Sequence, residues 1–355
     1  MVKEVYVLGA GFTKAFAPDA PLLVDSYDTP EVKEFDRFPI TRDILRQERS
    51  RCQRRGHKAD LNLERLMTRL AGGTPYDWRS AEKGLLDALL STLKRALLKK
   101  LHDARAAINV HWNDLESFAK HCRHKQISCI TFNYDDFLDK ALLKPDIREK
   151  GWHPDWGYGF YCNSSIVAIG ASKDPDPTIS RIVCICLLKL HGSVNWWVLH
   201  GHPTPYATDA MTHFEDWWTP TGLPETHDEP WAPRVTPYLE PEPFIVPPVL
   251  TKSDLVAQPV LRVVWSLAFD VLKKAQKVTF VGYSLPVTDI AASTLFREAL
   301  ADLDASTQIR VVDWAKDGKT GKQKLWQRYK EVFPKITLSQ IDLRGALEWA
   351  KEVSR

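Results

Sequence analysis

The sequence predicts an α/β protein with a parallel sheet flanked by helices and carrying a helical insertion. Short apolar runs rich in β-branched residues recur along the chain, and each ends in glycine or polar residues before a helical pattern begins. Such alternation of strands and helices is typical of parallel sheets. A length of 355 residues suits one large core with an insertion, or two lobes, and we expect one domain over residues 1–355.

Composition and charge exclude several classes of protein. A hydrophobic fraction of 44% and a charged fraction of 26% are ordinary for a soluble globular chain. A net charge of +3 is too small to indicate nucleic acid as a direct ligand, and the basic run at 46–58 is more typical of a solvated helix face. The six cysteines form no C-x-x-C pair, so we expect no metal. Without a signal-peptide pattern or a membrane-length apolar run, we expect a cytoplasmic protein.

The first predicted strand, residues 5–8, ends at Gly9-Ala10-Gly11 and leads into a helix that begins near Thr13. Glycines there allow close approach to a diphosphate, and the helix N-terminus offers free N–H groups. The dinucleotide fingerprint G-x-G-x-x-G would need glycine at position 14, where the chain has Lys14. A structural turn and a diphosphate site therefore both stay open.

A second apolar run ends on polar residues at Thr131, Asn133 and Asp135, immediately before another helical pattern. Ligands of open parallel sheets bind at such strand ends. An amide and a carboxylate two residues apart supply hydrogen bonding and negative charge. Capping of the next helix is the alternative, since Asn and Asp are favoured N-cap residues.

A third run, residues 182–190, ends at His191, which is followed by Gly192 and Ser193. This histidine is at the ligand edge of the predicted sheet, although a buried structural histidine is the simpler alternative. Residues 197–248 are rich in Pro, Trp and acidic residues without periodicity, so we expect an irregular surface excursion with short strands.

Two later strands complete the predicted sheet. Residues 278–281 end at Gly282-Tyr283-Ser284, and residues 309–312 end on Asp313, a carboxylate suited to ribose hydroxyls. Helices are expected at 254–276, 322–333 and 343–353. Between the first two strands, leucines at three- and four-residue spacing predict an all-helical insertion over 60–125, with its leucines in a core. Residues 18–39 are expected to be a long loop.

Taken in order, these strand-end motifs resemble those of the sirtuin-like family, specifically its prokaryotic NAD-consuming branch. The resemblance covers about residues 2–313 and implies a Rossmann-like sheet that holds NAD as the substrate across its strand ends. It implies that Asn133, Asp135 and His191 are the catalytic residues. The residues implied to bind NAD are Gly9, Ala10, Gly11, Phe12, Thr13, Gly282, Tyr283, Ser284 and Asp313, with the loop at 38–39 as a looser match.

Two departures from the protein deacylases of this family are informative. The cysteines cannot supply the four-cysteine zinc ribbon, and Phe132 occupies the position where glutamine usually precedes the asparagine. Both agree with the defence-associated NAD hydrolases, which resemble this chain in having Asn-Tyr-Asp and His-Gly-Ser followed by aromatic residues. The resemblance implies cleavage of NAD to ADP-ribose and nicotinamide by an antiphage abortive-infection effector. It further implies a homo-oligomer, or a separately encoded ATPase or sensor as partner.

Three alternatives remain at this stage. A protein deacylase or ADP-ribosyltransferase would need a peptide-binding cleft. A non-catalytic sensor of NAD or ADP-ribose would have no need for both Asn133 and His191. A Rossmann dehydrogenase could use Asp25 or Asp28 as the ribose carboxylate, but it would be expected to have glycine at position 14.

Overall fold

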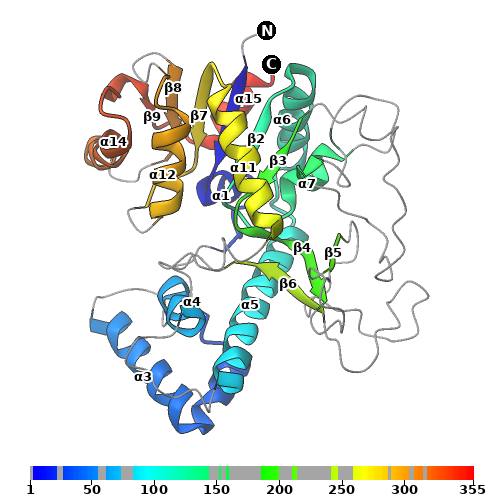
Figure 1. Cartoon of the computed structure of the whole chain (residues 1–355), viewed down its shortest axis with the longest axis vertical. Helices are drawn as coiled ribbons and strands as arrows, with labels where there is room; N and C mark the ends of the chain where they lie inside the picture. The colour runs from blue at the N-terminus through cyan, green and yellow to red at the C-terminus, as the bar shows by residue number, and fades with distance from the viewer. Residues whose placement is uncertain are drawn as a thin grey trace, which may run out of the picture.

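A six-stranded parallel sheet lies at the centre of the computed structural model, in the order β3-β2-β1-β7-β8-β9 (Figure 1). The strands are β1 (Glu4–Leu8), β2 (Ser128–Thr131), β3 (Leu187–Lys189), β7 (Lys277–Val281), β8 (Ile309–Val312) and β9 (Ile341–Asp342). The predicted α/β fold is confirmed, and this is the strand order of a Rossmann sheet. The structure describes residues 3–21, 27–54, 61–72, 83–143, 152, 157–159, 185–199, 210–213, 241–246, 259–286, 289–303, 308–314 and 318–355.

The strand ends are level across the sheet. Leu8 at the end of β1 pairs with Thr131 of β2 and Val281 of β7, and Thr131 pairs in turn with Lys189 of β3. On the other side, Val281 pairs with Val312 of β8. The residues that follow these strands therefore meet along one edge. The order of connection reverses between β1 and β7, the switch point where open α/β sheets bind ligands.

The alternation of side chains in β1 shows why this strand is central. Tyr6 and Leu8 lie in one buried cluster, and Val5 and Val7 lie in another on the opposite face. Both faces are covered, which explains a continuous apolar run without polar alternation. The first cluster includes residues of α1 (Ala10–Phe16), α6 (Trp112–Lys125), α7 (Phe137–Leu142) and α15 (Ala346–Val353). The second includes residues of α11 (Pro259–Lys273), α12 (Ile290–Ala299) and α14 (Lys319–Val332).

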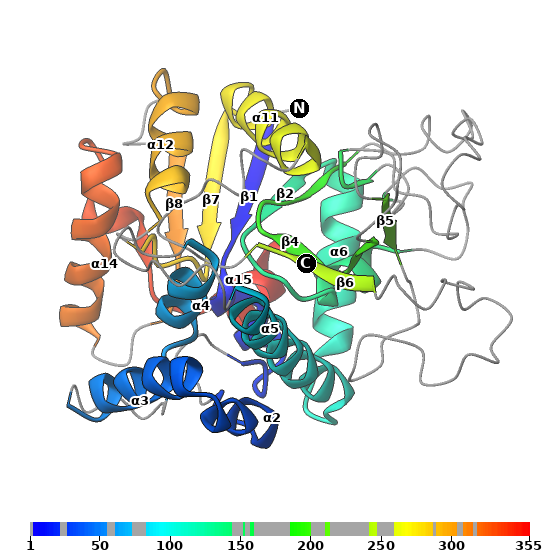
Figure 2. The same ribbon diagram turned by 60° about the horizontal axis from the view of Figure 1, so that its bottom comes forward.

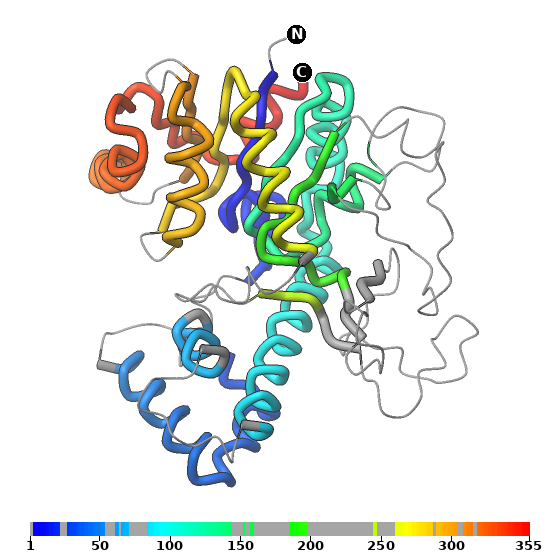
Figure 3. The backbone as a smooth tube through the Cα atoms, viewed as in Figure 1, coloured from blue at the N-terminus to red at the C-terminus, as the bar shows by residue number. Residues whose placement is uncertain are grey.

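A helical lobe lies beyond the carboxyl edge of the sheet, and α5 runs from it toward that edge (Figures 2 and 3). It contains α2 (Pro30–Lys33), a 3-10 turn (Glu34–Arg37), α3 (Pro39–Arg54), α4 (Leu63–Gly72) and α5 (Lys83–Ala106). Most of its leucines are buried in one cluster, as the spacing predicts, and Leu85, Leu86 and Leu90 are partly buried against it. That cluster also includes Tyr134 from the loop after β2.

The lobe differs from the expected insertion at both ends. The loop expected over 18–39 is wrong at 30–37, because Pro30 starts a helical turn whose N-cap Thr29 accepts a hydrogen bond from Val32 N–H at 3.4 Å. At the other end, α6 is a sheet-covering helix, with Phe118 packed on Tyr6 at 5.7 Å between ring centroids.

The excursion over 197–248 is described only in part. A three-stranded antiparallel sheet is formed by β4 (Gly192–Leu199), β5 (Ala210–His213) and β6 (Pro241–Ile245), in the order β5-β4-β6. The remainder of that excursion lies outside the described residues. Within the described part of the chain, no helix is long and apolar enough to cross a membrane.

Candidate active site

The glycines after β1 and β7 bring two loops into direct contact at the switch point. Gly11 N–H donates to the Gly282 carbonyl at 2.8 Å, and a Cβ on Gly9 would lie 2.5 Å from that oxygen. Gly282 has φ of +61°, and a Cβ on it would lie 2.0 Å from the Phe12 nitrogen. These glycines are therefore required for close contact between the two loops. The sequence motif alone did not distinguish this structural role from a diphosphate site. Ala10 is exposed at the start of α1.

Gly282→Ala should lower the melting temperature by several degrees, since the left-handed backbone and the steric clash both oppose a side chain there. Gly84→Ala is the matched control: Gly84 lies in α5 with nothing within 4 Å of an added Cβ, so the substitution should be neutral or slightly stabilising. Thermal unfolding followed by circular dichroism measures both. Equal melting temperatures for the two variants would contradict the packing role of Gly282.

A chain of hydrogen bonds joins the loop after β2 to α1. Asn133 Nδ2 donates to the Gly9 carbonyl and to Thr13 Oγ1, both at 2.8 Å. Thr13 Oγ1 in turn donates to Asp135 Oδ2 at 2.6 Å. Among the described residues no donor reaches Asn133 Oδ1, so this oxygen can accept a hydrogen bond from a ligand. The structure thus brings together Gly9, Thr13, Asn133 and Asp135.

Helix capping explains part of this loop. Asp135 Oδ1 accepts from Phe137 N–H, the first residue of α7, at 3.3 Å. Asn133 makes no contact with α7 among the hydrogen bonds of the described residues; its own N–H donates to Thr131 Oγ1 at 3.0 Å. The N-cap residue of α7 is Asp136, which makes no side-chain capping bond; Asp135 satisfies one N–H of the helix from the preceding position, and Asn133 takes no part in capping.

Burial changes the acidity of Asp135. Loss of hydration raises the pKa of this carboxyl from its ordinary 3.8 to about 6, against the opposing effects of Lys189 and Thr13. Burial likewise raises the pKa of Asp136, whose carboxylate accepts a hydrogen bond from Arg105 Nη1 at 2.6 Å. Asp135 is therefore protonated in weak acid and ionised near neutral pH.

Because folding raises this pKa, the folded protein retains a proton on Asp135 that the unfolded chain has lost between about pH 4 and pH 6. Stability should fall as the pH rises through that window. Asp135→Asn should remove this contribution, which is on the order of 3 kcal/mol. Urea unfolding of both proteins from about pH 4 to pH 8 measures it, and parallel stability curves would show that Asp135 does not titrate as described.

A buried lysine supports the same loop from β3. Lys189 is completely buried, and its ammonium donates to the Asp135 carbonyl at 2.5 Å and to the Asp139 carboxylate at 2.9 and 3.1 Å. Tyr158 Oη also donates to Asp139, at 2.5 Å, and Asn195 Nδ2 donates to Tyr158 Oη at 3.1 Å. This network fixes the position of the Asp135 carbonyl. The sequence alone did not predict the network. A lysine inside an apolar run was the available signal.

His191 follows β3, the strand next to β2, and is buried between aromatic rings. Phe132 packs edge-on to it at 5.3 Å between ring centroids, and Tyr134 lies at 6.1 Å. Its carbonyl accepts from Val246 N–H at 2.9 Å. The residues that flank Asn133 therefore contact His191, while Asn133 itself bonds toward α1. Phe132, noted above only as a departure from a motif, stacks on Tyr283 at 4.5 Å and joins the two halves of the edge.

The other side chains that the resemblance implies in NAD binding separate into two groups. The rings of Tyr283 and Phe12 are buried in the core, and Tyr283 Oη donates to Asp289 Oδ2 at 2.9 Å. Ser284 is exposed, and Asp313 is half-buried after β8, where its Oδ1 accepts from Trp314 N–H at 2.8 Å. The side chains of Ser284 and Asp313 are thus not part of the core, whereas those of Tyr283 and Phe12 serve packing.

Other sequence candidates have structural partners. Arg49 of the basic run forms a bidentate ion pair with Asp28 at 2.7 and 3.0 Å and a second pair with Asp36 at 2.8 Å. Asp28 is therefore committed to Arg49, which weakens the dehydrogenase alternative; Asp25 lies outside the described residues. In the described part of the chain, no group of three His, Cys, Asp or Glu residues is arranged to hold a metal ion.

Solved structures distantly similar to the chain include a mutant Sir2 homologue in complex with ADP-ribose. It shares 14% identity and a TM-score of 0.44, over 99% of this chain and 90% of that chain. A second is Sir2Tm bound to a propionylated peptide, with 11% identity and a TM-score of 0.40, over 99% of this chain and 91% of that chain. No family model and no curated protein matches the sequence.

Proposed function

We propose that this chain hydrolyses NAD at the bond between nicotinamide and ribose, giving ADP-ribose and nicotinamide. The observation that carries the proposal is the chain of hydrogen bonds from Gly9 through Asn133 and Thr13 to Asp135, at the switch point of a Rossmann sheet. The motif resemblance argued from the sequence points to the same reaction.

The reaction needs a negative, preorganised environment more than it needs an acid. In NAD the nicotinamide ring is a positively charged pyridinium. It departs as neutral nicotinamide, because the electrons of the broken C–N bond return to the ring. A positive, oxocarbenium-like ribose remains, and a fixed negative charge stabilises it. Asp135 supplies that charge when ionised, so turnover should fall below about pH 6, where the pKa of its carboxyl lies.

Two further groups complete the proposed mechanism. Asn133 Oδ1 accepts a hydrogen bond from a ribose hydroxyl or from the attacking water, while its Nδ2 is held by Gly9 and Thr13. His191, when neutral, takes the proton that water loses as its oxygen bonds to the ribose carbon. Gly9, Ala10 and Gly11 lie under the diphosphate in this proposal, and Gly282, Ser284 and Asp313 lie along the adenosine half.

The same motif resemblance leads us to propose an antiphage role, in which the chain acts as an abortive-infection effector. The proposed assembly is a homo-oligomer, or a complex with a separately encoded ATPase or sensor. The helical lobe and the excursion over 197–248 are the segments proposed to make its contacts.

The test is to incubate purified protein with NAD and excess EDTA, without peptide, and to resolve nicotinamide and ADP-ribose by chromatography while calorimetry records NAD binding. Both products in equal amounts are expected. Nicotinamide release only after addition of an acyl-lysine peptide would indicate a deacylase instead. Tight binding of NAD without turnover, in the chain alone and in its native assembly, would indicate a sensor.

A further inference from the structure

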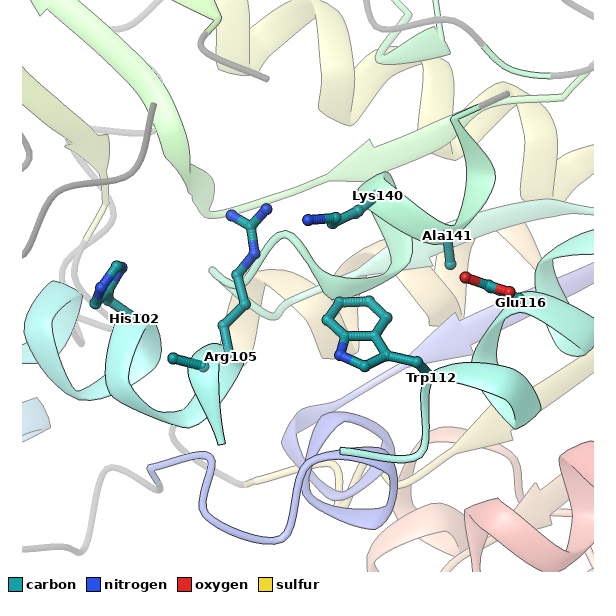
Figure 4. Close-up of a pocket in the computed structure, with 7 residues that line it drawn as sticks. His102, Arg105, Trp112, Glu116, Lys140 and Ala141 are labelled. Carbon is teal, nitrogen blue, oxygen red and sulfur yellow. The ribbon is translucent and has the colours of Figure 1, made fainter. Parts of the chain in front are cut away.

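A cavity of about 470 Å³ lies between the end of α5, the start of α6, and α7 (Figure 4). Its lining includes Arg105, Trp112, Lys140, His102 and Glu116. None of these residues belongs to the proposed active site. The volume falls within the range of small-molecule sites, which is about 300–1,000 Å³.

Two cations converge on this cavity. Arg105 and Lys140 extend toward one another above the indole of Trp112 (Figure 4). The Arg105 side chain is only 12% exposed, and within the described residues its one hydrogen bond is from Nη1 to Asp136. A guanidinium has five N–H donors, so most of those on Arg105 remain available to a ligand. Asp136 holds the guanidinium in place, which lowers the entropic cost of binding.

Lys140 differs from Arg105 in lacking an acidic partner. It is exposed, and its Nζ lies 5.8 Å from the Trp112 ring centroid, while no carboxylate among the described residues lies within ion-pair distance. Asp136 pairs with Arg105 and Glu116 lies on the far side of Trp112 from Arg105, so the Lys140 ammonium leaves one unbalanced positive charge at the Arg105 end of the cavity. That charge suits a compact anion such as a phosphate, which arginine binds through paired N–H groups.

Trp112 supplies a flat apolar surface beside the cations. The indole is half-buried and is held by Phe137 at 5.6 Å between ring centroids, with 32° between the planes. Stacking on such a ring is tolerant of base identity, because every nucleobase has a π-face. Glu116 lies at the far side of Trp112 from Arg105 (Figure 4), where its carboxylate can accept from the amino or hydroxyl groups of a ligand.

We propose that this cavity is a second ligand site that binds a nucleoside phosphate, with the phosphate between Arg105 and Lys140 and the base on Trp112. Inorganic phosphate would satisfy the cations and leave the indole uncovered, so a nucleotide should bind more tightly than either of its parts. The proposal stands independently of the proposed NAD hydrolysis, because it concerns binding at residues outside the strand ends.

Calorimetric titration with AMP, adenosine and inorganic phosphate tests the site in the full-length chain. AMP should bind at least 10-fold more tightly than adenosine or phosphate. Lys140→Glu should weaken AMP binding at least 10-fold, and Trp112→Leu should weaken it several-fold. The matched control is Lys120→Glu, the same charge reversal at an exposed lysine of α6 outside the cavity, which should leave binding unchanged.

AMP could also bind at the strand ends, through the adenosine side of the proposed active site. Asp313→Ala removes a carboxylate there and should leave the AMP affinity of the cavity unchanged. Loss of AMP binding in Asp313→Ala but not in Lys140→Glu would overturn the proposal. Equal losses in Lys140→Glu and Lys120→Glu, or no binding at millimolar AMP, would also overturn it. Lys140 is exposed, so its variant should fold, which a melting curve confirms.

Discussion

Asn133→Ala should lower the kcat for NAD cleavage about 100-fold or more, with little loss of stability. The substitution removes the Oδ1 acceptor proposed to order the reacting ribose. It leaves few unsatisfied groups, since the Gly9 carbonyl still accepts from Phe12 N–H at 2.8 Å. Thr13 still donates to Asp135. The side chain is only half-buried, so truncation creates no large cavity.

Asp313→Ala provides the contrast. Its proposed contact is with the adenosine ribose, which is distant from the bond that breaks. The strength of that contact should therefore be the same in the ground state and in the transition state. Its loss should raise KM and leave kcat nearly unchanged. Steady-state kinetics of both variants, with melting curves, separate the two effects. A normal kcat in folded Asn133→Ala would remove this residue from the mechanism.

His191→Ala belongs in the same series and should also lose most turnover. Here the structural alternative is stronger, because the ring packs against Phe132 and Tyr134. The His191→Ala variant should therefore melt at a lower temperature than Asn133→Ala. If His191→Ala retains near-normal kcat while folded, the histidine serves packing only.

The strand ends were predictable because apolar runs stop abruptly where strands meet solvent or ligand. That signal placed Thr131, Lys189, Val281 and Val312 at or beside strand ends, and the register brings those ends level. By contrast, β9 has two residues, Ile341 and Asp342, too few for any period. It pairs with β8, and an ion pair between Arg310 and Asp342 at 2.6 Å accompanies that pairing without leaving any local pattern in the sequence.

Contacts between segments distant in the chain were beyond prediction. Tyr134 lies between two candidate site residues, yet its ring belongs to the core of the helical lobe and its hydroxyl donates to the Val246 carbonyl at 2.9 Å. Phe132 was identified only as a replacement for glutamine, although it stacks on Tyr283 across the edge. Such roles depend on tertiary packing, which a single sequence does not encode in any local pattern.

Lys189→Met should be the most destabilising of the substitutions considered, by about 3–5 kcal/mol near neutral pH. Methionine replaces the four-atom apolar stem of lysine and lacks only the terminal ammonium, so most of the effect comes from the lost charge rather than from a cavity. The Asp139 carboxylate, which is 4% exposed, would lose its ammonium partner and keep only Tyr158 as a hydrogen-bond donor in the described network. The Asp135 carbonyl would also lose a donor.

The matched control is Lys140→Met, an exposed lysine on the same helix as Asp139, which should change stability by less than about 0.5 kcal/mol. The double variant Lys189→Met with Asp139→Asn should recover part of the loss, because removal of both charges leaves no buried ion without a partner.

Urea unfolding of the three variants measures these differences. If Lys189→Met is as stable as the unmodified chain, the ammonium does not balance Asp139, and the positioning of Asp135 must come from Thr13 and α7 alone.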